Sequence, residues 1–213
     1  MNKKQIIIST LLLVHGAAHA VPLVNLSDAK KRVQKYYETG DYDRDLEKIV
    51  ARAKRKFKKI KFQNNATVIF DIDDTILSDY GDTKSISFGY IPKLYHEWVL
   101  EADAPAIPQV KELYDYLVER GFTIVFLTGR KYNEYDATIQ NLKREGFTKF
   151  DRLIVRQPHE LKLSAREYKT ARRKKLEQAG YNIVGAIGDQ TSDLVGGYTG
   201  IRIKVPNYIY AID

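Results

Sequence analysis

Apolar residues follow two spacings along the chain, and the two spacings alternate. One segment places them at helical spacing, at Leu46, Ile49, Val50, Ala53 and Phe57. This periodicity predicts a helix that begins with Asp41 as its N-cap. Short runs that are apolar throughout predict strands instead. We expect strands at residues 66–70, 123–127, 152–155, 182–187 and 201–205.

The segments between these runs carry helix signals. We expect helices over residues 96–100, 109–120, 134–145 and between Ser164 and Gly180. A capping box of Ser164 and Glu167 begins the last of these, and Gly180 ends it. Because the strands are apolar along their whole length, they are typical of a parallel sheet with helices on both faces. The predicted fold class is therefore α/β, a doubly wound parallel sheet.

No repeat or linker divides the chain after its first twenty residues. We therefore expect one main domain over residues 66–213, preceded by an N-terminal helical extension over residues 21–65. Residues 76–104 are less regular and are expected to form a small, mainly helical cap. In open parallel sheets, ligands bind outside the carboxyl ends of the strands. The functional site is expected at that edge, beneath the cap.

Polar residues gather where three of the predicted strands end. They are Asp71 and Asp73 after the first strand, Thr128 and Gly129 after the second, and Asp189 and Asp193 after the strand that ends at Ile187. Side chains two apart on an extended strand point the same way, so Asp71 and Asp73 are expected to face one spot. From these two residues alone, solvated acids that begin a turn are an equally good interpretation.

Two like charges held together need a cation, a shared proton or a phosphoryl group. Carboxylates of Asp71, Asp189 and Asp193, with the main-chain carbonyl of Asp73, offer the hard oxygen ligands that suit Mg²⁺. With such an ion in place, Asp71 could attack phosphorus, and Asp73 could act as general acid and base. Asp193 has an alternative role as a helix cap after Ser192.

Two further residues are candidates for binding a phosphoryl group. Thr128 could donate its hydroxyl and backbone N–H, and Lys169, near a helix start, could reach the same edge. Each has a simpler interpretation, because such a Thr is usually a turn residue and such a Lys is usually solvated. Position alone does not separate Lys169 from Lys162.

The chain of 213 residues carries a formal net charge of +8 and no cysteine. Its densest basic stretch lies between Arg52 and Lys61, which favours a solvated helix face. Such a stretch could attract nucleic acid, but it comes without a recognition module, so we expect no nucleic-acid partner. Without cysteine the protein has no disulfides and no lipid attachment site.

The first twenty residues resemble a secretory leader. Lys3 and Lys4 precede an apolar run over residues 6–14, and Ala18-His19-Ala20 fits a cleavage site. We predict cleavage after Ala20 and export, to the periplasm or outside the cell. The alternative is an anchor, but the run is far shorter than the roughly 20 apolar residues of a spanning helix. No stable membrane anchor is therefore expected.

Four motifs occur in a fixed order. They are Asp71-Ile72-Asp73-Asp74-Thr75, Phe126-Leu127-Thr128-Gly129-Arg130, Tyr168-Lys169 with Arg172 or Arg173, and Gly188-Asp189-Gln190-Thr191-Ser192-Asp193-Leu194. In this order they resemble the haloacid dehalogenase (HAD) superfamily of phosphohydrolases, and within it the acid phosphatase branch. That branch includes bacterial class B and class C enzymes and plant vegetative storage proteins. The resemblance extends from about Ala66 to the C-terminus, with Thr191 where many relatives carry Trp.

The resemblance implies a Rossmann-like core and a Mg²⁺-dependent acid phosphatase that acts on phosphate monoesters. It implies that Asp71 is the nucleophile and forms an aspartyl-phosphate, that Asp73 is the acid and base, and that Asp189 binds magnesium. By the same resemblance, Thr128, Gly129 and Lys169 bind the phosphoryl group. Asp193 is then either an outer ligand of the metal or the residue that orients Lys169. The resemblance also favours Lys169 over Lys162.

Two alternative functions remain at this point. Some plant storage relatives lack the nucleophilic Asp, so the presence of Asp71 favours an active enzyme over a silent storage or binding protein. A phosphotransferase that passes the phosphoryl group to an acceptor alcohol would use the same intermediate. For substrates, Tyr80, Phe88, Tyr90 and Tyr132 could stack on a nucleobase or an aryl group, although aromatic residues more often only pack.

Overall fold

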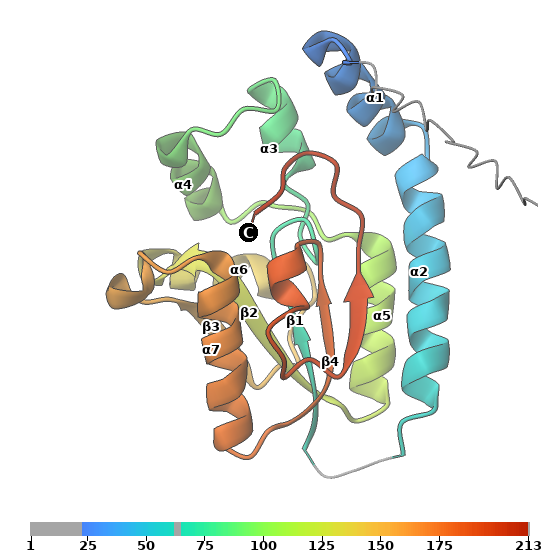
Figure 1. The fold of residues 1–213 in the computed structure, drawn as a ribbon, viewed down its shortest axis with the longest axis vertical. Coiled ribbons are helices and arrows are strands. Elements are labelled where there is room, and N and C mark those ends of the chain that lie inside the picture. Colours follow the sequence, from blue (N-terminus) through green and yellow to red (C-terminus); the bar gives the residue numbers. More distant parts are fainter. Residues whose placement is uncertain (1–22, 62–64, 213) are drawn as a thin grey trace, which may run out of the picture.

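The strands of the central sheet all run in the same direction, toward the edge that α3, α4 and the C-terminal segment cover (Figure 1). The computed structural model describes residues 23–61 and 65–212. The sheet has the order β3-β2-β1-β4-β5. Its strands are β1 (Ala66–Phe70), β2 (Thr123–Lys131), β3 (Arg152–Arg156), β4 (Asn182–Gly188) and β5 (Ile201–Lys204). The predicted leader, residues 1–20, lies outside the described residues.

Helices lie before and between the strands. They are α1 (Leu26–Glu38), α2 (Asp41–Lys58), α3 (Tyr80–Ser85), α4 (Pro92–Glu101), α5 (Pro108–Glu119), α6 (Tyr135–Arg144) and α7 (Ala165–Gln178). Three single 3₁₀ turns complete the set: η1 (Tyr132–Glu134), η2 (Pro158–Glu160) and η3 (Thr191–Asp193). None of the helices in the described ranges has both the length and the apolar character that a membrane span requires.

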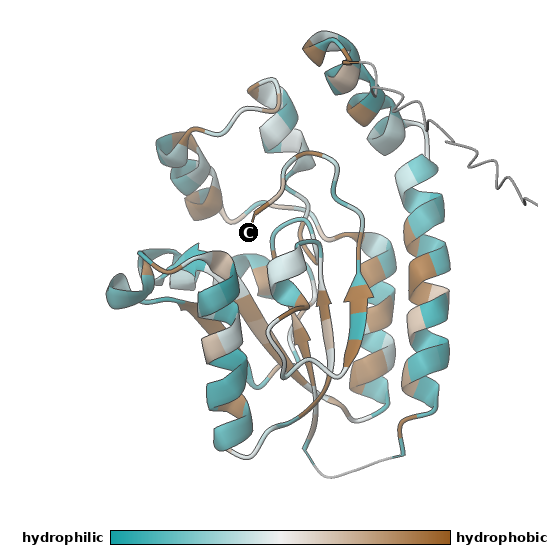
Figure 2. Ribbon diagram, in the orientation of Figure 1, coloured by the Kyte–Doolittle hydropathy of each residue, from teal (hydrophilic) through white to brown (hydrophobic). Residues whose placement is uncertain are grey.

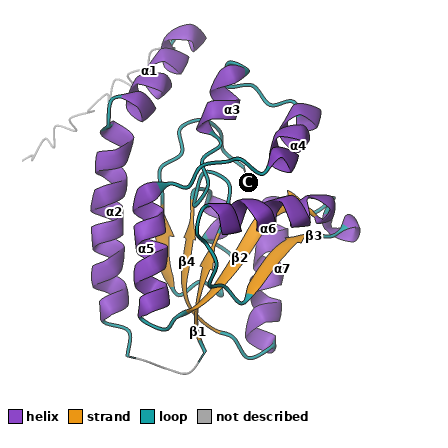
Figure 3. Ribbon diagram, turned by 180° about the vertical axis from the view of Figure 1, so that it is seen from behind, coloured by secondary structure: helices purple, strands orange, loops and turns teal. Residues whose placement is uncertain are grey.

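Both faces of the sheet are buried, as the continuous apolar strands predict. Val68 and Phe70 of β1 belong to the larger core, with residues of α2 and α5, whereas Ile69 points into a smaller core with Tyr168 and Leu176 of α7. Figures 1 and 3 show α5 and α2 on one side of the sheet and α7 on the other, and Figure 2 shows apolar strands between helices with polar outer surfaces. The predicted α/β fold with a parallel sheet is confirmed.

The N-terminal extension is built on α2, which packs beside α5. Its buried residues are those of the predicted apolar stripe together with Tyr42, whereas Ile49 is only partly buried. Asp41 is the first helical residue rather than the cap, because Gly40 with φ 81° precedes it. A Cβ at Gly185 of β4 would lie 2.5 Å from the Phe57 ring, so the close approach of α2 to the sheet requires glycine there.

Two features of the core differ from the sequence expectation. β2 continues to Lys131, and its pairing with β3 shifts register between Leu127 and Lys131, so Thr128 lies inside an irregular strand end rather than after the strand. The segment expected as a cap contains the short α3 as well as α4. His96 of α4 contacts the buried Glu134 through Nδ1 and Oε1 at 2.7 Å, which ties this segment to the core.

Candidate active site

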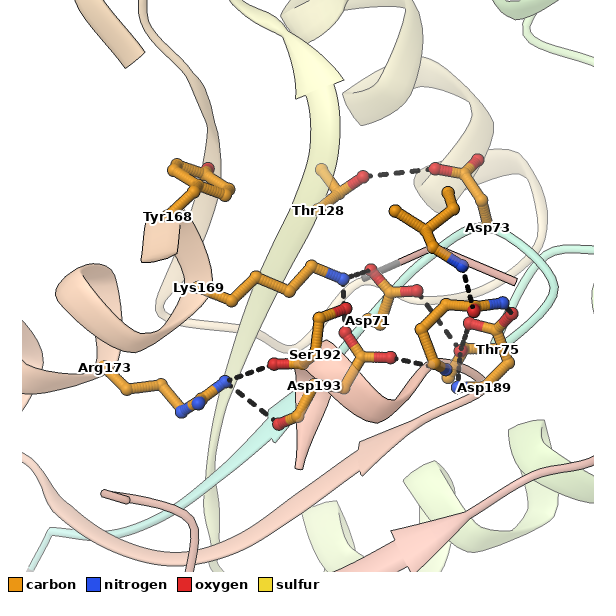
Figure 4. A network of polar contacts seen from close by, with 12 residues as sticks. Asp71, Asp73, Thr75, Thr128, Tyr168, Lys169, Arg173, Asp189, Ser192 and Asp193 are labelled. Atoms are coloured by element: carbon orange, nitrogen blue, oxygen red, sulfur yellow. Dashed lines mark hydrogen bonds and ion pairs between the residues drawn. The ribbon is translucent and has the colours of Figure 1, made fainter. Parts of the chain in front are cut away.

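The predicted site residues come from five separate elements and meet at the carboxyl edge of the sheet (Figure 4). Asp71 directly follows β1, Thr128 lies near the end of β2, Lys169 lies in α7, Asp189 directly follows β4 and Asp193 lies in η3. All five side chains are buried. Segments far apart in the sequence therefore build one site.

Three carboxylates form the centre of this site. Asp71, Asp189 and Asp193 each offer an oxygen within 4.8 Å of the other two. The Nζ of Lys169 donates to Asp71 Oδ1 at 2.7 Å and also to Asp193 Oδ1. Three carboxylates and one ammonium leave two negative charges without a partner in this group. Buried charges need compensation, so the group is able to hold a divalent cation.

The hydroxyl of Thr75 links two of these acids. It donates to Asp71 Oδ2 at 3.3 Å or to Asp189 Oδ1 at 3.2 Å, and it accepts the backbone N–H of Asp189 at 3.0 Å. One oxygen of Asp71 therefore contacts Lys169, while the other contacts Thr75, which also contacts Asp189. Thr75 stands in the same sequence motif as Asp71, but the motif alone did not predict this link.

The burial of these groups shifts their pKa values. Burial raises the pKa of Asp71 well above its usual range, opposed by Lys169 and assisted by Asp193 and Asp189. Burial also raises the pKa of Asp189, as does the charge of Asp193. For Lys169, burial lowers the pKa, but Asp193 and Asp71 outweigh it and raise the pKa above its ordinary value. Lys169 stays charged, and the acids are short of positive charge.

Asp193 has both carboxylate oxygens occupied. Oδ1 accepts from Lys169, and Oδ2 accepts the backbone N–H of Gln190 at 2.8 Å. The fully buried Arg173 donates to the backbone carbonyl of Asp193 at 2.9 Å and so fixes the η3 turn that carries Asp193. Arg172 instead pairs with Glu160 at 2.5 Å. Of the two arginines in the motif, Arg173 is the one that reaches the site.

Asp73 lies apart from the three-acid group. Its Oδ1 accepts from Arg130 Nε at 2.8 Å, and its Oδ2 accepts from Thr128 Oγ1 at 3.2 Å. The expectation that Asp71 and Asp73 face one spot is therefore not met in this structure. Asp71 contacts Lys169 and Asp73 contacts Thr128 (Figure 4), and Asp73 also pairs with Arg130. The contact of Arg130 with Asp73 was not predicted from the sequence. A Cβ at Gly129 would meet no atom within 4 Å, so the backbone there is open.

Comparison with known families decides the identity of the chain. The model of the HAD superfamily, subfamily IIIB (Acid phosphatase), matches residues 12–213. The chain belongs to this family. Membership places this acid phosphatase among the phosphoric monoester hydrolases, and the family resemblance found in the sequence is confirmed.

Two plant proteins and one solved structure are similar to this acid phosphatase. The stem 28 kDa glycoprotein of Glycine max is 37% identical over 185 residues, and acid phosphatase 1 of Solanum lycopersicum is 31% identical over 186 residues. In both comparisons the match covers 84% of this chain and 73% of the relative. The class C acid phosphatase from Bacillus anthracis has the same fold, with a TM-score of 0.72, 22% identity, and coverage of 88% of this chain and 87% of that one.

Proposed function

We propose that this acid phosphatase hydrolyses phosphate monoesters with the help of Mg²⁺ and forms an aspartyl-phosphate on Asp71. The observation that carries the proposal is the placement of the buried Asp71, which has one oxygen on Lys169 and the other on Thr75, beside the acids Asp189 and Asp193. A nucleophilic carboxylate needs a neighbouring cation to remain ionised when buried. Lys169 meets that need on one side of Asp71, and Mg²⁺ would meet it on the other.

Three groups would hold the metal ion: the carboxylates of Asp71 and Asp189 and the main-chain carbonyl of Asp73. Hard oxygen ligands with excess negative charge suit Mg²⁺, which keeps water at its remaining positions. When bound, the ion neutralises charge on the phosphoryl oxygens. Asp193 serves a different role in this proposal, because both of its oxygens are occupied. It orients Lys169 toward Asp71.

The reaction then has two displacements. In the first, an oxygen of Asp71 attacks phosphorus, the bond from phosphorus to the leaving oxygen breaks, and Asp73 gives that oxygen a proton. In the second, water attacks the phosphorus of the aspartyl-phosphate, Asp73 takes a proton from it, and inorganic phosphate leaves. Lys169, the Thr128 hydroxyl and the open backbone at Gly129 bind the phosphoryl oxygens in both steps.

The segment over residues 76–104 is proposed to form the cap that selects the substrate. α3 and α4 of this segment lie above the carboxyl edge of the sheet (Figure 1). Tyr90 in this segment is 69% exposed, and Tyr132 in η1 is 50% exposed, so both have free ring surface. Tyr80 is only partly exposed and stacks on Tyr37 at a distance of 4.7 Å between ring centroids. Small monoesters with an aryl or nucleoside group are the substrates that we propose.

Replacement of the nucleophile tests the proposal. Asp71→Asn should abolish release of phosphate from an aryl phosphate in the presence of Mg²⁺, because the amide cannot form the covalent intermediate. Asp136→Asn is the control, since Asp136 is exposed on α6. Circular dichroism and thermal melting would show that both variants fold. Mass spectrometry after an acid quench would detect the phosphate adduct on wild-type Asp71.

Substantial turnover by a folded Asp71→Asn variant would exclude Asp71 as nucleophile. If the wild-type protein released no phosphate from aryl, sugar and nucleoside monophosphates with Mg²⁺ present, a storage or binding role would replace the enzymatic one. An acceptor alcohol added to the same assay would reveal phosphotransfer as a rise in transferred over free phosphate.

Export is the remaining part of the proposal. It is supported by the basic start, the apolar run and the small residues that end at Ala20. N-terminal sequencing of the protein recovered from its host should give Val21 as the first residue. A mature chain that retains Lys3 and Lys4 would contradict the proposed leader.

A further inference from the structure

The C-terminal segment returns to the acid group after β5. Figure 1 shows it passing between the α3–α4 region and the sheet, with the C-terminus near the middle of the molecule. Lys204, the last residue of β5, donates through Nζ to the backbone carbonyl of Asp189, and Asn207 reaches the side chain of the same residue. Two side chains from this segment thus contact one acid of the site.

The carboxylate of Asp189 has two distinct sides. Oδ1 lies on the side of Thr75, whose hydroxyl also contacts Asp71. Oδ2 lies on the opposite side and accepts two amide N–H groups, from Gln190 Nε2 at 2.5 Å and Asn207 Nδ2 at 2.7 Å. Oδ2 is therefore occupied, and Oδ1 is the oxygen that is left for the metal ion.

The amide of Asn207 is itself held in place by the tail. Its Oδ1 accepts the backbone N–H groups of Ile209 at 2.8 Å and Tyr210 at 3.4 Å, which fixes the direction of Nδ2. Gln190 is held in the same way, because its Oε1 accepts the backbone N–H of Ile212 at 2.9 Å. Both donors to Asp189 are thus oriented by residues 207–212.

We infer that Asn207 is a positioning residue for the metal ligand Asp189, and that the C-terminal segment supplies the outer shell of the metal site. The inference rests on the proposed function, in which Asp189 binds a divalent cation. The donors on Oδ2 prevent the carboxylate from rotating and keep Oδ1 directed toward Asp71. Partners of this kind typically contribute about 10–100-fold to metal affinity or activity.

The sharpest test uses Asn207→Ser. The serine hydroxyl can still accept the backbone N–H two residues on, so the turn keeps its own hydrogen bond. It is too short to reach Asp189, so only the donor to Oδ2 is lost. Tyr208→Ala is the matched control, because Tyr208 is the next residue of the tail, is 62% exposed and packs on Tyr36.

Mg²⁺ affinity would be measured by isothermal titration calorimetry on the full chain, in the absence of substrate. We expect affinity to fall about tenfold or more in Asn207→Ser and to stay within about twofold of wild type in Tyr208→Ala. In the aryl phosphate assay, the Mg²⁺ concentration for half-maximal activity should rise by the same factor in Asn207→Ser. The value of kcat at saturating Mg²⁺ should change much less, because Asn207 does not contact the reacting atoms.

The outcomes separate this inference from the proposed function. Wild-type protein that binds no Mg²⁺ would remove the metal from the proposed function. Wild-type protein that binds Mg²⁺ while Asn207→Ser binds it equally well would overturn the role of Asn207 and leave the proposed function intact. If Asn207→Ser melts below the assay temperature, Gln190→Ala provides the same comparison, since it removes the other donor to Oδ2. Unchanged affinity in that variant would also count against a positioning shell.

Discussion

At the scale of single residues, the site is a chain of buried polar contacts that begins at Arg173 and ends at Asp71. Arg173 donates to the backbone carbonyl of Asp193, and Lys169 then forms ion pairs with Asp193 and Asp71. These side chains are almost fully buried, so Lys169 and the two acids depend on one another for compensation of charge. Loss of one charged side chain therefore leaves its partner buried without compensation of charge.

Lys169→Met tests this dependence. The change leaves Asp71 and Asp193 without their shared cation, so it should lower the free energy of unfolding by about 3 kcal/mol and abolish turnover. Urea unfolding and the aryl phosphate assay would measure the two effects. Lys162→Met is the control, because Lys162 is exposed and should leave both quantities nearly unchanged. A Lys169→Met variant with wild-type stability would show that the two ion pairs of Lys169 contribute little to the free energy of unfolding.

Asp73→Asn tests the acid and base role at the neighbouring position. The variant should slow turnover by about 10²–10⁴-fold, since one group serves both proton transfers. The loss should be smaller for an aryl phosphate with a strongly acidic leaving group, which departs without a proton. Values of kcat/KM for two aryl phosphates of different leaving-group pKa would measure this, because kcat/KM reports the first displacement and not the hydrolysis of the intermediate. An equal loss of kcat/KM for both substrates would point to a structural role, through Arg130 and Thr128.

The sequence could identify the acids and the lysine of the site, but not the residues that orient them. Asp71 and Asp189 stand at predicted strand ends, which the topology brings together, whereas only the family resemblance favoured Lys169 over Lys162. Thr75 and Asn207 act through contacts across long sequence separations. A lone Thr or Asn has many ordinary roles in turns. Only the packed structure shows which acid each one touches.

At the scale of elements, the tight turn after β4 sets the position of Asp193. A Cβ at Gly188 would lie 2.2 Å from Asp193 Oδ2, so the last residue of the strand must be glycine for η3 to fold back over it. The continuous apolar pattern predicted β4 itself. The irregular end of β2 was not predictable, because the register shift depends on how β3 pairs with it.

Gly188→Ala should therefore displace Asp193, weaken its hold on Lys169 and cost about 1–3 kcal/mol of stability from overpacking. Gly129→Ala is the comparison at the other strand end, because a Cβ there meets no protein atom within 4 Å. Gly129→Ala should retain stability and lose activity only where the methyl group obstructs the phosphoryl group. Unfolding curves and kcat/KM for both variants would distinguish overpacking at position 188 from obstruction of the phosphoryl group at position 129. Equal stability of the two alanine variants would contradict the contact at Gly188.

At the scale of the whole molecule, we expect the buried acids at the carboxyl edge of the sheet to destabilise the metal-free protein. Burial and the charge of Asp189 raise the pKa of Asp74 to about 7, and burial also raises the pKa of Asp79 well above its usual range. Together with Asp71 and Asp189, these carboxylates favour a bound cation over an empty site. At a free concentration of 100 times its Kd, Mg²⁺ should raise the free energy of unfolding by about 2.7 kcal/mol. Thermal melting with Mg²⁺ and with a chelator would measure this shift, and identical curves would contradict it.

The pH dependence of the metal-free protein follows from the same burial. Asp74 has a pKa that is raised on folding from 3.8 to about 7, so it contributes its stability below pH 3.8 and loses it as the pH rises through 7. Asp74→Asn removes this titration, keeps an acceptor for the backbone N–H of Asp79, and tolerates the φ of 51° at this position. With a chelator present, the difference in free energy of unfolding between the variant and the wild type should therefore shift in favour of the variant by roughly 2 kcal/mol from pH 5 to pH 7. Urea unfolding at both pH values would measure this difference in stability. A difference that does not grow in favour of the variant would contradict a raised pKa of Asp74 in the folded protein.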